Sequence, residues 1–434
     1  MEREELSAWL RLTLTPGVGN GAARKLLAAF GLPTAVFTQP ANALMQVVST
    51  TQATSLRTEP PGLALQLETT WRWLHGEGMG DSTGEGTRER TGERTGERTG
   101  QRRIVVLGDA GYPSSLLNIE DPPLMLYLLG AALMDVDTAE TQTEHAYIAS
   151  DLIAKYLVSS AAQSIAIVGS RNPTPQGLVN ARQFARALGT AGLTIVSGMA
   201  LGVDGAAHEG ALEGFEDLSA LKKGEEKSAP ARLSTIAVVG TGLDRVYPKS
   251  HRALAHKIAR HGLIISEYPL GTPPLALNFP RRNRIIAGLT QGTLVVEAAL
   301  KSGSLITARM AAEQGKEVFA IPGSIHSTQS RGCHALIRQG AKLVESALDV
   351  LEDMKIESAT ILIATHAQDT GTGGTNDSEN VLLEALGFDP VSLDALQART
   401  GIDTPNLQAQ LMALELQGQV ARLPGGLFQR TAEA

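Results

Sequence analysis

The chain has 434 residues, of which 43% are hydrophobic, so it is long enough for two or three domains with sizeable cores. Its formal net charge of −7 at pH 7 excludes a uniformly basic nucleic-acid-binding protein, and any DNA contact therefore requires a local basic patch. A single cysteine, Cys333, excludes an intrachain disulfide and a cysteine-based zinc site, and no apolar run is long enough to span a bilayer, so we expect a cytoplasmic protein without a metal ion.

Residues 1–76 are expected to form a small helical domain, and residues 77–103 a linker. The segment 15–21, Thr-Pro-Gly-Val-Gly-Asn-Gly, separates two predicted helices and resembles the turn of a helix-hairpin-helix motif. Its glycines would let backbone N–H groups approach a DNA phosphate, but a plain tight turn in a SAM-like helical domain is favoured, because such short motifs often match by chance. The linker repeats Thr-Gly-Glu-Arg and is too polar to bury a core, so we expect it to be disordered.

Residues 104–355 are expected to form the main domain, because short apolar strands alternate there with helical segments. Strands are expected at 104–107, 124–129, 164–168, 193–197, 234–239, 262–266, 293–297, 317–321 and 342–344, and the main helices at 176–190, 203–213, 250–261, 281–289 and 304–314. The alternation predicts an α/β fold with a mostly parallel sheet that helices cover on both faces. Two segments are interpreted as insertions, a helical one at 131–162 and a charged, solvated loop at 213–231.

The C-terminal part is expected to be a winged-helix domain over residues 378–434, after a second linker at 356–377. Three short helices, at 379–386, 391–398 and 404–417, precede a hairpin around Pro424-Gly425-Gly426. This order is typical of a winged helix. Because the third helix carries no lysine or arginine, we expect this domain to have a protein-interaction or accessory role rather than to bind DNA.

The most distinctive motif follows the uncharged strand 164–168. Gly169, Ser170 and Arg171 end this strand, and a helix begins near Gln176. A buried strand that leads through small residues into a helix N-terminus is a typical anion site, and an arginine adds a bidentate fork for phosphate. We therefore expect this turn to hold a phosphate group.

Other polar turns follow further strands, at the sheet edge where ligands of such folds bind. These turns contain Ser197, Gly198 and Met199; Gly240, Thr241 and Gly242; and Glu297 followed by Lys301, Ser302, Gly303, Ser304 and Thr307. For Gly240 and Gly242 a tight turn explains the glycines as well as ligand binding does. For the segment 301–307 we favour phosphate binding, because a turn requires neither a cation nor several hydroxyls.

The segment Phe279 to Arg284 combines an aromatic residue with Arg281, Arg282 and Arg284, and no acidic residue interrupts it. Such a composition suits single-stranded nucleic acid, because cations follow the phosphates while the aromatic ring stacks on a base. Arginines in the first turn of a helix also oppose its dipole, which favours a nearby anion. We expect Phe279, Arg281 and Arg284 to contact DNA, with Arg282 directed elsewhere.

Taken in this order, these segments resemble the DNA-processing protein A family (DprA, also called Smf) from about residue 112 to about residue 344. The Gly-Ser-Arg turn corresponds to Gly169–Arg171, the Phe-Pro-x-Arg-Asn-Arg segment to Phe279–Arg284, and the Ser-Gly-Ser-Leu-x-Thr-Ala segment to Ser302–Ala308. The resemblance implies an extended Rossmann-like core. It also implies a protein without catalytic residues or cofactor that binds single-stranded DNA, loads the RecA recombinase during natural transformation, and forms a homodimer through the Rossmann-like domain.

Three enzyme classes are alternatives to this interpretation. A dinucleotide-dependent oxidoreductase needs Gly-x-Gly-x-x-Gly, but Arg245 stands at the third glycine of the Gly240 turn. A P-loop ATPase is excluded because Gly315-Lys316 is followed by Glu317. A nucleoside-monophosphate phosphoribohydrolase stays the best enzyme alternative, because Gly292, Thr293 and Glu297 partly match its motif, although Leu289-Thr290-Gln291 replaces its glycine-rich start.

Overall fold

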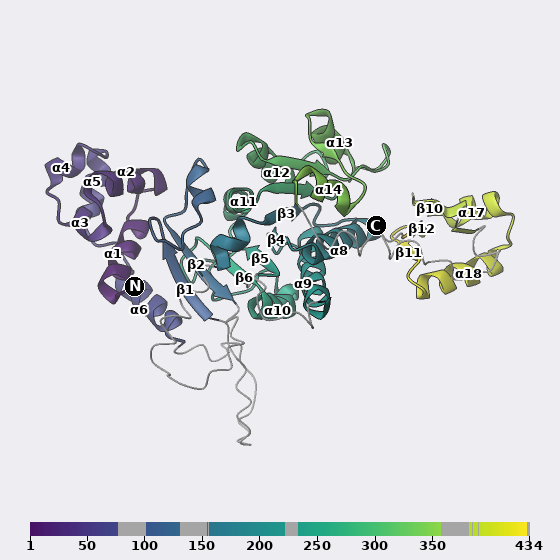
Figure 1. Cartoon of the computed structure of the whole chain (residues 1–434), viewed down its shortest axis with the longest axis horizontal. Coiled ribbons are helices and arrows are strands. Elements are labelled where there is room, and N and C mark those ends of the chain that lie inside the picture. Colours follow the sequence, from purple (N-terminus) through teal and green to yellow (C-terminus); the bar gives the residue numbers. More distant parts are fainter. Residues whose placement is uncertain are drawn as a thin grey trace, which may run out of the picture. The chain divides into compact units, whose positions relative to one another are not determined.

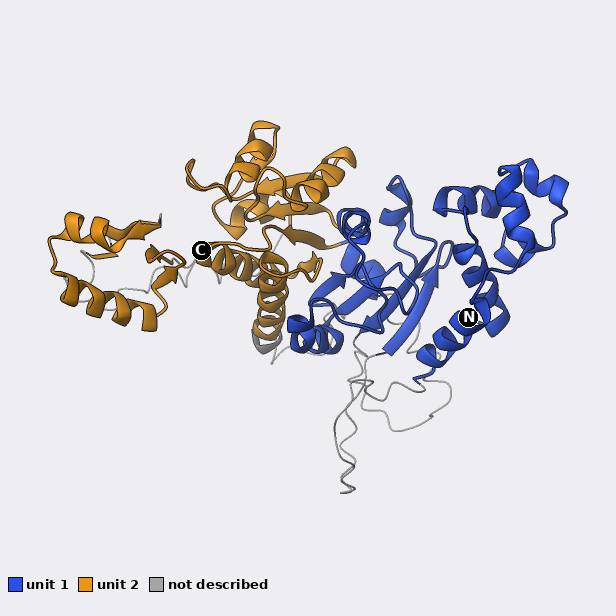
Figure 2. Ribbon diagram, turned by 180° about the vertical axis from the view of Figure 1, so that it is seen from behind, with its two compact units in different colours: residues 1–162, 230–289 blue, residues 163–229, 290–434 orange. Residues whose placement is uncertain are grey.

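The computed structural model describes residues 1–76, 101–130, 154, 156–221, 233–356, 382–383, 385–388 and 390–431. The chain divides into two compact units, one of residues 1–162 and 230–289 and the other of residues 163–229 and 290–434 (Figure 2). Each unit contributes strands and helices of its own, which Figure 1 labels. The predicted α/β class with a mostly parallel sheet is confirmed.

The first unit begins with helices, as the sequence predicts. These are α1 (Arg3–Leu14), α2 (Asn20–Phe30), α3 (Pro33–Phe37), α4 (Ala41–Met45), α5 (Thr50–Arg57) and α6 (Leu63–Leu74). Leu6, Trp9, Leu10 and Leu12 lie on α1 and are almost completely buried. Because α1 is apolar on the side that the other helices cover, it forms the centre of this helical group.

The start of α2, which directly follows the turn after α1, contacts the loop 120–122. The Asn20 side chain donates a hydrogen bond of 3.1 Å to Asp121, and the Arg24 guanidinium donates one of 2.9 Å to the same carboxylate. Arg24 also donates to the carbonyl oxygens of Glu120 and Pro122, at 3.2 Å each. The start of α2 is thus docked on the loop 120–122, which supports the interpretation of the glycine-rich segment as a plain turn.

The strands of the first unit are β1 (Gln101–Val106), β2 (Met125–Gly130), β5 (Thr235–Val238) and β6 (Leu263–Ser266), in the order β1-β2-β6-β5. The β1–β2 and β2–β6 pairs are antiparallel and the β5–β6 pair is parallel. The helical elements are η1 (Ser114–Asn118), η2 (Lys249–His251), α10 (Arg252–His261) and α11 (Asn278–Leu289). Since β1 starts at Gln101, the expected linker at 77–103 ends three residues earlier than predicted, and its other residues lie outside the described part.

The second unit has a parallel set of strands in the order β4-β3-β7-β8-β9. The strands are β3 (Ser164–Val168), β4 (Thr194–Ser197), β7 (Gly292–Val295), β8 (Glu317–Ala320) and β9 (Lys342–Leu343). The helices are α8 (Pro175–Thr190), α9 (Val203–Leu221), α12 (Ser304–Glu313), α13 (Arg331–Arg338) and α14 (Ala347–Asp353). A buried cluster joins one face of these strands to α8, α9 and α14, as expected for strands covered by helices.

The prediction of a solvated loop from residue 213 is wrong for its first part, because α9 continues to Leu221. Glu213 pairs with Arg182 on α8, and Asp217 pairs with Arg186 at 2.6 Å. The two arginines are four residues apart on α8, and the two acidic residues are four residues apart on α9. A basic face of α8 therefore lies against an acidic face of α9. Residues 222–231 lie outside the described part, as does most of the expected insertion at 131–162, of which residues 154 and 156–161 are helical.

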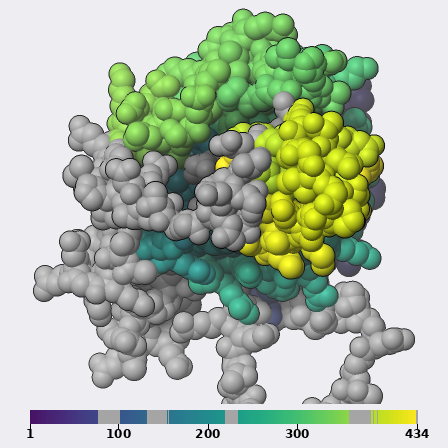
Figure 3. Space-filling model, turned by 90° about the vertical axis from the view of Figure 1, so that its right-hand side faces the viewer, coloured from purple at the N-terminus to yellow at the C-terminus, as the bar shows by residue number. Residues whose placement is uncertain are grey.

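Residues 390–431 have the elements expected of a winged helix and appear as the yellow body in Figure 3. They form β10 (Val391–Ser392), α17 (Leu393–Thr400), α18 (Thr404–Leu416), β11 (Val420–Leu423) and β12 (Leu427–Arg430). Leu396, Leu407, Leu411 and Leu414 form the centre of their buried cluster. On α18, Met412 and Leu416 are exposed, and exposed apolar side chains of this kind suit a protein contact better than a phosphate backbone.

The α8–α9 contact gives a stability prediction. Gly210 and Gly214 lie on α9, and a Cβ atom at either position would overlap the carbonyl oxygen of Arg182 or Arg186 on α8. Replacing Gly210 by alanine should separate the helices and destabilise the fold by about 1–3 kcal/mol, seen as a lower thermal unfolding midpoint. The matched control is Gly189→Ala, because a Cβ there meets its nearest neighbour at an ordinary 3.5 Å. Equal midpoints for both variants would contradict the account.

Candidate nucleic-acid interface

The turns that follow β3, β4 and β7 pack against one another in the second unit. A Cβ atom on Gly169 would lie 2.7 Å from Val203 and 3.0 Å from the carbonyl oxygen of Glu297, so only glycine fits there. The Val203 N–H donates a 3.1 Å hydrogen bond to the Ser170 carbonyl, and the Ser197 hydroxyl donates one of 2.7 Å to the Ile167 carbonyl. The structure therefore brings the predicted turns at 169–171 and 197–199 together.

The predicted site residues of this unit fall into a buried group and an exposed group. The buried ones are Ser170, Ser197, Gly198, Met199, Ser304 and Thr307; Gly169 and Ser302 are half-buried; Arg171, Lys301 and Gly303 are exposed. Buried hydroxyls and glycines shape the turns, whereas Arg171 and Lys301 carry positive charge to the surface. A phosphate would reach these two cations first.

Met199 has a left-handed backbone conformation, with φ at 66°. A residue with a large side chain holds such a conformation only at a cost of about 1–3 kcal/mol. Its side chain is 2% exposed, so the surrounding core holds it in place. Backbone strain of this kind concentrates at functional sites, and here it falls within the predicted turn 197–199.

The N-terminus of α8 is occupied by a carboxylate of the chain itself. Glu297 accepts hydrogen bonds from the Thr174 amide at 2.9 Å and from the Thr174 hydroxyl at 2.6 Å. Its carboxyl carbon lies 2.5 Å from where a Cβ atom of Gly177 would be, so the absence of a side chain at Gly177 makes room for it. Burial raises the pKa of Glu297, and the hydrogen bonds from Thr174 oppose that rise. The carboxylate of Glu297 therefore already compensates the dipole of α8. A ligand phosphate could contact the turn 169–171, which precedes this helix, but not the helix N-terminus itself.

The N-terminus of α12 is different. Its first turn contains no acidic residue, and its N-cap residue, Gly303, provides no side-chain hydrogen bond. The Ser302 and Ser304 hydroxyls lie 2.7 Å apart, and the adjacent Lys301 forms no ion pair with any residue that the structure describes. A helix dipole favours an anion at this end, and two hydroxyls and a lysine suit a phosphate group.

In the first unit, the three arginines at the start of α11 have different environments. Arg281 is exposed. Arg282 is buried and donates to the Val238 carbonyl oxygen, as expected for the arginine that was set apart from the site. Arg284 is 12% exposed and pairs with the similarly buried Glu267. The sequence around Arg284 holds no acid, so this partner, 17 residues away, was missed.

Arg284 belongs to a network that reaches the helical domain. Its guanidinium lies 3.6 Å from the carboxylate of Asp121, which also accepts the hydrogen bonds from Asn20 and Arg24 on α2. Arg281, Arg284, Glu267 and Asp121 line a cavity of about 240 Å³. Because its charge is paired, Arg284 holds α11 in position. Arg281 is the arginine of this helix that is exposed and can contact a ligand.

Phe279 is half-buried and lies against the turn after β5. A Cβ atom on Gly240 would lie 3.2 Å from its ring, and the buried Asn278 amide donates a 3.0 Å hydrogen bond to the Gly240 carbonyl. On Gly242 a Cβ atom would lie 2.7 Å from the carbonyl oxygen of Pro269. Close packing thus explains why glycine stands at both positions.

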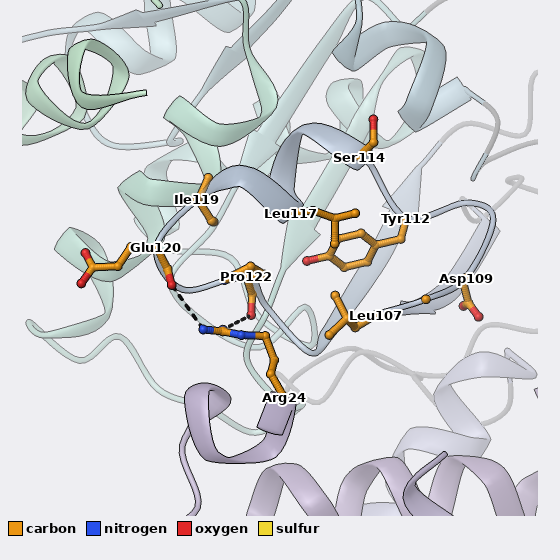
Figure 4. A pocket seen from close by; sticks show the side chains of 10 residues that line it. Arg24, Leu107, Asp109, Tyr112, Ser114, Leu117, Ile119, Glu120 and Pro122 are labelled. Carbon is orange, nitrogen blue, oxygen red and sulfur yellow. Dashed lines mark hydrogen bonds between the residues drawn. The ribbon is translucent and has the colours of Figure 1, made fainter. Parts of the chain in front are cut away.

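A second cavity in the first unit, of about 500 Å³, is shown in Figure 4. Leu107, Leu117, Ile119 and Pro122 give it apolar walls, and the Arg24 guanidinium lies at its edge. Because Arg24 pairs with Asp121 and donates to the carbonyl oxygens of Glu120 and Pro122, its charge is already compensated within the protein. This cavity is therefore a poor anion site.

Other chemistry receives little support from the described residues. No group of three or more histidine, cysteine, aspartate or glutamate side chains among them is placed to hold a metal ion. Cys333 is buried against the carbonyls of Val295 and Val296, and burial raises the pKa of its thiol to about 12. Asp204, in the first turn of α9, accepts a hydrogen bond of 3.1 Å from the Ala200 amide, which precedes the helix. None of the described helices is both long and apolar enough to cross a membrane.

Comparisons with known proteins agree with this architecture. The family model described as DNA recombination-mediator protein A matches residues 155–355, and the DprA winged helix domain matches residues 366–426. Protein Smf of Synechocystis is 35% identical over 350 residues, 74% of this chain and 78% of that protein. Protein Smf of Escherichia coli is 41% identical over 60% of this chain and 66% of that protein. The X-ray structure of DprA from Streptococcus pneumoniae has a TM-score of 0.53 and 29% identity, and covers 81% of this chain and 98% of that one.

The pairing of Arg284 predicts a stability effect that depends on pH. Arg284→Ala leaves the Glu267 carboxylate buried without its partner, which should cost about 3–5 kcal/mol at neutral pH. Burial already raises the pKa of Glu267 and Arg284 opposes that rise, so the pKa should rise further in the variant. Because the folded chain then binds the proton more tightly than the unfolded chain, stability should return as the pH falls through the raised pKa toward 4.5.

Urea unfolding at neutral and mildly acidic pH measures this effect. The double variant Glu267→Gln/Arg284→Ala is the control, because it removes the unpaired charge and should be more stable than Arg284→Ala at neutral pH. An Arg284→Ala protein with unchanged stability would show that the ion pair contributes nothing.

Proposed function

This chain belongs to the DNA-processing protein A (DprA/Smf) family, and from that premise we propose that it is a recombination mediator that binds single-stranded DNA. In this proposal the protein grips the sugar–phosphate backbone and makes or breaks no bond. Binding of a phosphate group needs only cations, hydroxyls and helix dipoles held in place. Both units carry groups of this kind.

The arrangement that carries the proposal is the pair of exposed cations in the second unit, Arg171 and Lys301. Each follows a strand and precedes or borders a helix start, and no acidic partner is described for Lys301. On an acidic protein, exposed cations at these two turns are the local basic patch that DNA binding requires. We assign phosphate contacts to Gly169, Ser170, Arg171, Lys301, Ser302 and Ser304, with the buried 197–199 turn and Thr307 as support.

In the first unit, Arg281 is assigned a phosphate contact of its own and Phe279 stacks on a base. The ion pairs of Arg284 lead us to give it a positioning role, by which it holds α11 and so orients Arg281. Backbone and stacking contacts discriminate poorly between bases, so sequence preference should be weak.

The family resemblance adds the remaining partners to the proposal. We propose that the protein acts in the cytoplasm during natural transformation, delivers DNA to RecA, and forms a homodimer through the Rossmann-like domain. The apolar residues Met412 and Leu416 on α18 support a protein contact for the winged helix. This helix has no basic residue in its sequence.

A phosphoribohydrolase is not favoured. Its catalytic carboxylate would be Glu297, but that side chain is bound to the Thr174 amide and hydroxyl at the start of α8. Glu297 is therefore explained by a structural role. Release of base from nucleoside monophosphates by the purified protein would reverse this conclusion.

The phosphate contacts predict a matched set of binding changes. Arg171→Ala and Lys301→Ala should each weaken binding of a labelled oligothymidylate, measured by fluorescence anisotropy across a salt series. Each should also reduce the steepness of the log–log salt dependence by about 0.7, the value for one single-strand phosphate. Arg338→Ala is the control, because it removes the same charge from an exposed position of the second unit. If both variants bind like Arg338→Ala, the phosphates lie elsewhere.

A further inference from the structure

The loop between β5 and α10 carries an aromatic ring that the chain leaves half open to solvent. Tyr247 is 48% exposed, and its ring lies 5.7 Å from the ring of Phe279, centroid to centroid, with 34° between the planes. Aromatic pairs at this separation attract one another. Each ring therefore supports the other while part of the pair remains uncovered.

The ring of Phe279 stands on anchored backbone. Asn278, next to Phe279, donates to the Gly240 carbonyl, and the Tyr268 hydroxyl donates a 3.3 Å hydrogen bond to the carbonyl of Asn278. Phe279 itself fills the space that the missing side chain of Gly240 leaves. The position of Phe279 is thus fixed before any ligand binds. Its ring therefore loses little conformational freedom when a base stacks on it.

Basic side chains and one apolar side chain surround the rings of Tyr247 and Phe279. Arg281 follows Phe279 on α11, and Arg245 and Lys249 flank Tyr247; all three are exposed, and Arg245 is partly neutralised by Asp244 at 2.9 Å. Leu277, just before α11, is 78% exposed. Exposed rings bordered by cations match the chemistry of unpaired nucleotides, whose bases stack while their phosphates seek positive charge.

We propose that Tyr247 is a second base-contacting residue, which forms with Phe279 a two-ring platform for successive bases of single-stranded DNA. This inference rests on the proposed function and makes it more specific, since it assigns part of the affinity to unpaired bases as well as to phosphates. Duplex DNA, whose bases are already stacked on one another, gains nothing from the platform. Selectivity for single strands then originates in the first unit.

The test compares binding of a labelled oligothymidylate with binding of an abasic oligonucleotide of the same length. Tyr247→Ala should weaken oligothymidylate binding roughly 5- to 150-fold, the range measured for loss of one stacked base. It should leave binding of the abasic strand unchanged, because that strand has phosphates but no bases. Tyr247→Phe keeps the ring and should bind like the unmodified protein. Leu117→Ala, at an apolar position of the same unit that is 53% exposed, is the control for loss of exposed apolar surface.

The outcomes separate the platform from the proposed function. If the unmodified protein binds neither strand at low salt, the proposed function fails and the platform with it. If it binds, and Arg171→Ala and Lys301→Ala weaken it while Tyr247→Ala does not, only the platform is wrong. Equal weakening of both strands by Tyr247→Ala would also overturn it, because the ring would then act through the fold or through phosphate contacts.

Discussion

A helix dipole is stabilised by negative charge at its N-terminus, and the three helices that follow β3, β4 and β7 meet this condition in different ways. At α8 the chain supplies the carboxylate of Glu297, bound through Thr174. At α9 it supplies Asp204, within the first turn. At α12 it supplies no carboxylate and places Lys301 beside the helix start. Because each helix follows a parallel strand, all three N-termini lie at the same kind of strand-to-helix turn. The acidic residues of the chain compensate the dipoles of α8 and α9, so the N-terminus of α12 is the one of these three that suits an anionic ligand.

A related selection occurs in the first unit, where the buried carboxylate of Glu267 and the half-exposed carboxylate of Asp121 compensate part of the basic helix α11. Glu267 and Asp121 hold Arg284, and Asp121 also holds Arg24 from the helical domain. A buried ion pair adds little net stability, but removal of one partner is costly. The network therefore fixes where α11 lies, which sets the positions of Arg281 and Phe279. In the proposed function, folding and DNA binding thus use different arginines of one helix.

Most strands and helices could be predicted from the sequence, because apolar runs of four or five residues alternate with longer amphipathic segments. The length of α9 could not, since Glu213 and Asp217 are typical of a solvated loop until α8 provides Arg182 and Arg186. Nor could the pairing of Arg284, because Asp121 is distant in the chain and meets α11 only in the folded unit. The role proposed for Tyr247 has a weaker signal in the sequence than that of Phe279, because Asp244 stands beside Arg245 in this otherwise basic segment.

The central claim is that the start of α12 receives a phosphate while the start of α8 is closed by Glu297. Backbone hydrogen exchange with and without oligothymidylate tests both parts at once, because bound phosphate protects the amides that face it. The account predicts slower exchange in peptides that contain residues 301–306 when DNA is added, and unchanged exchange at 174–178. Protection at 174–178 without protection at 301–306 would contradict it.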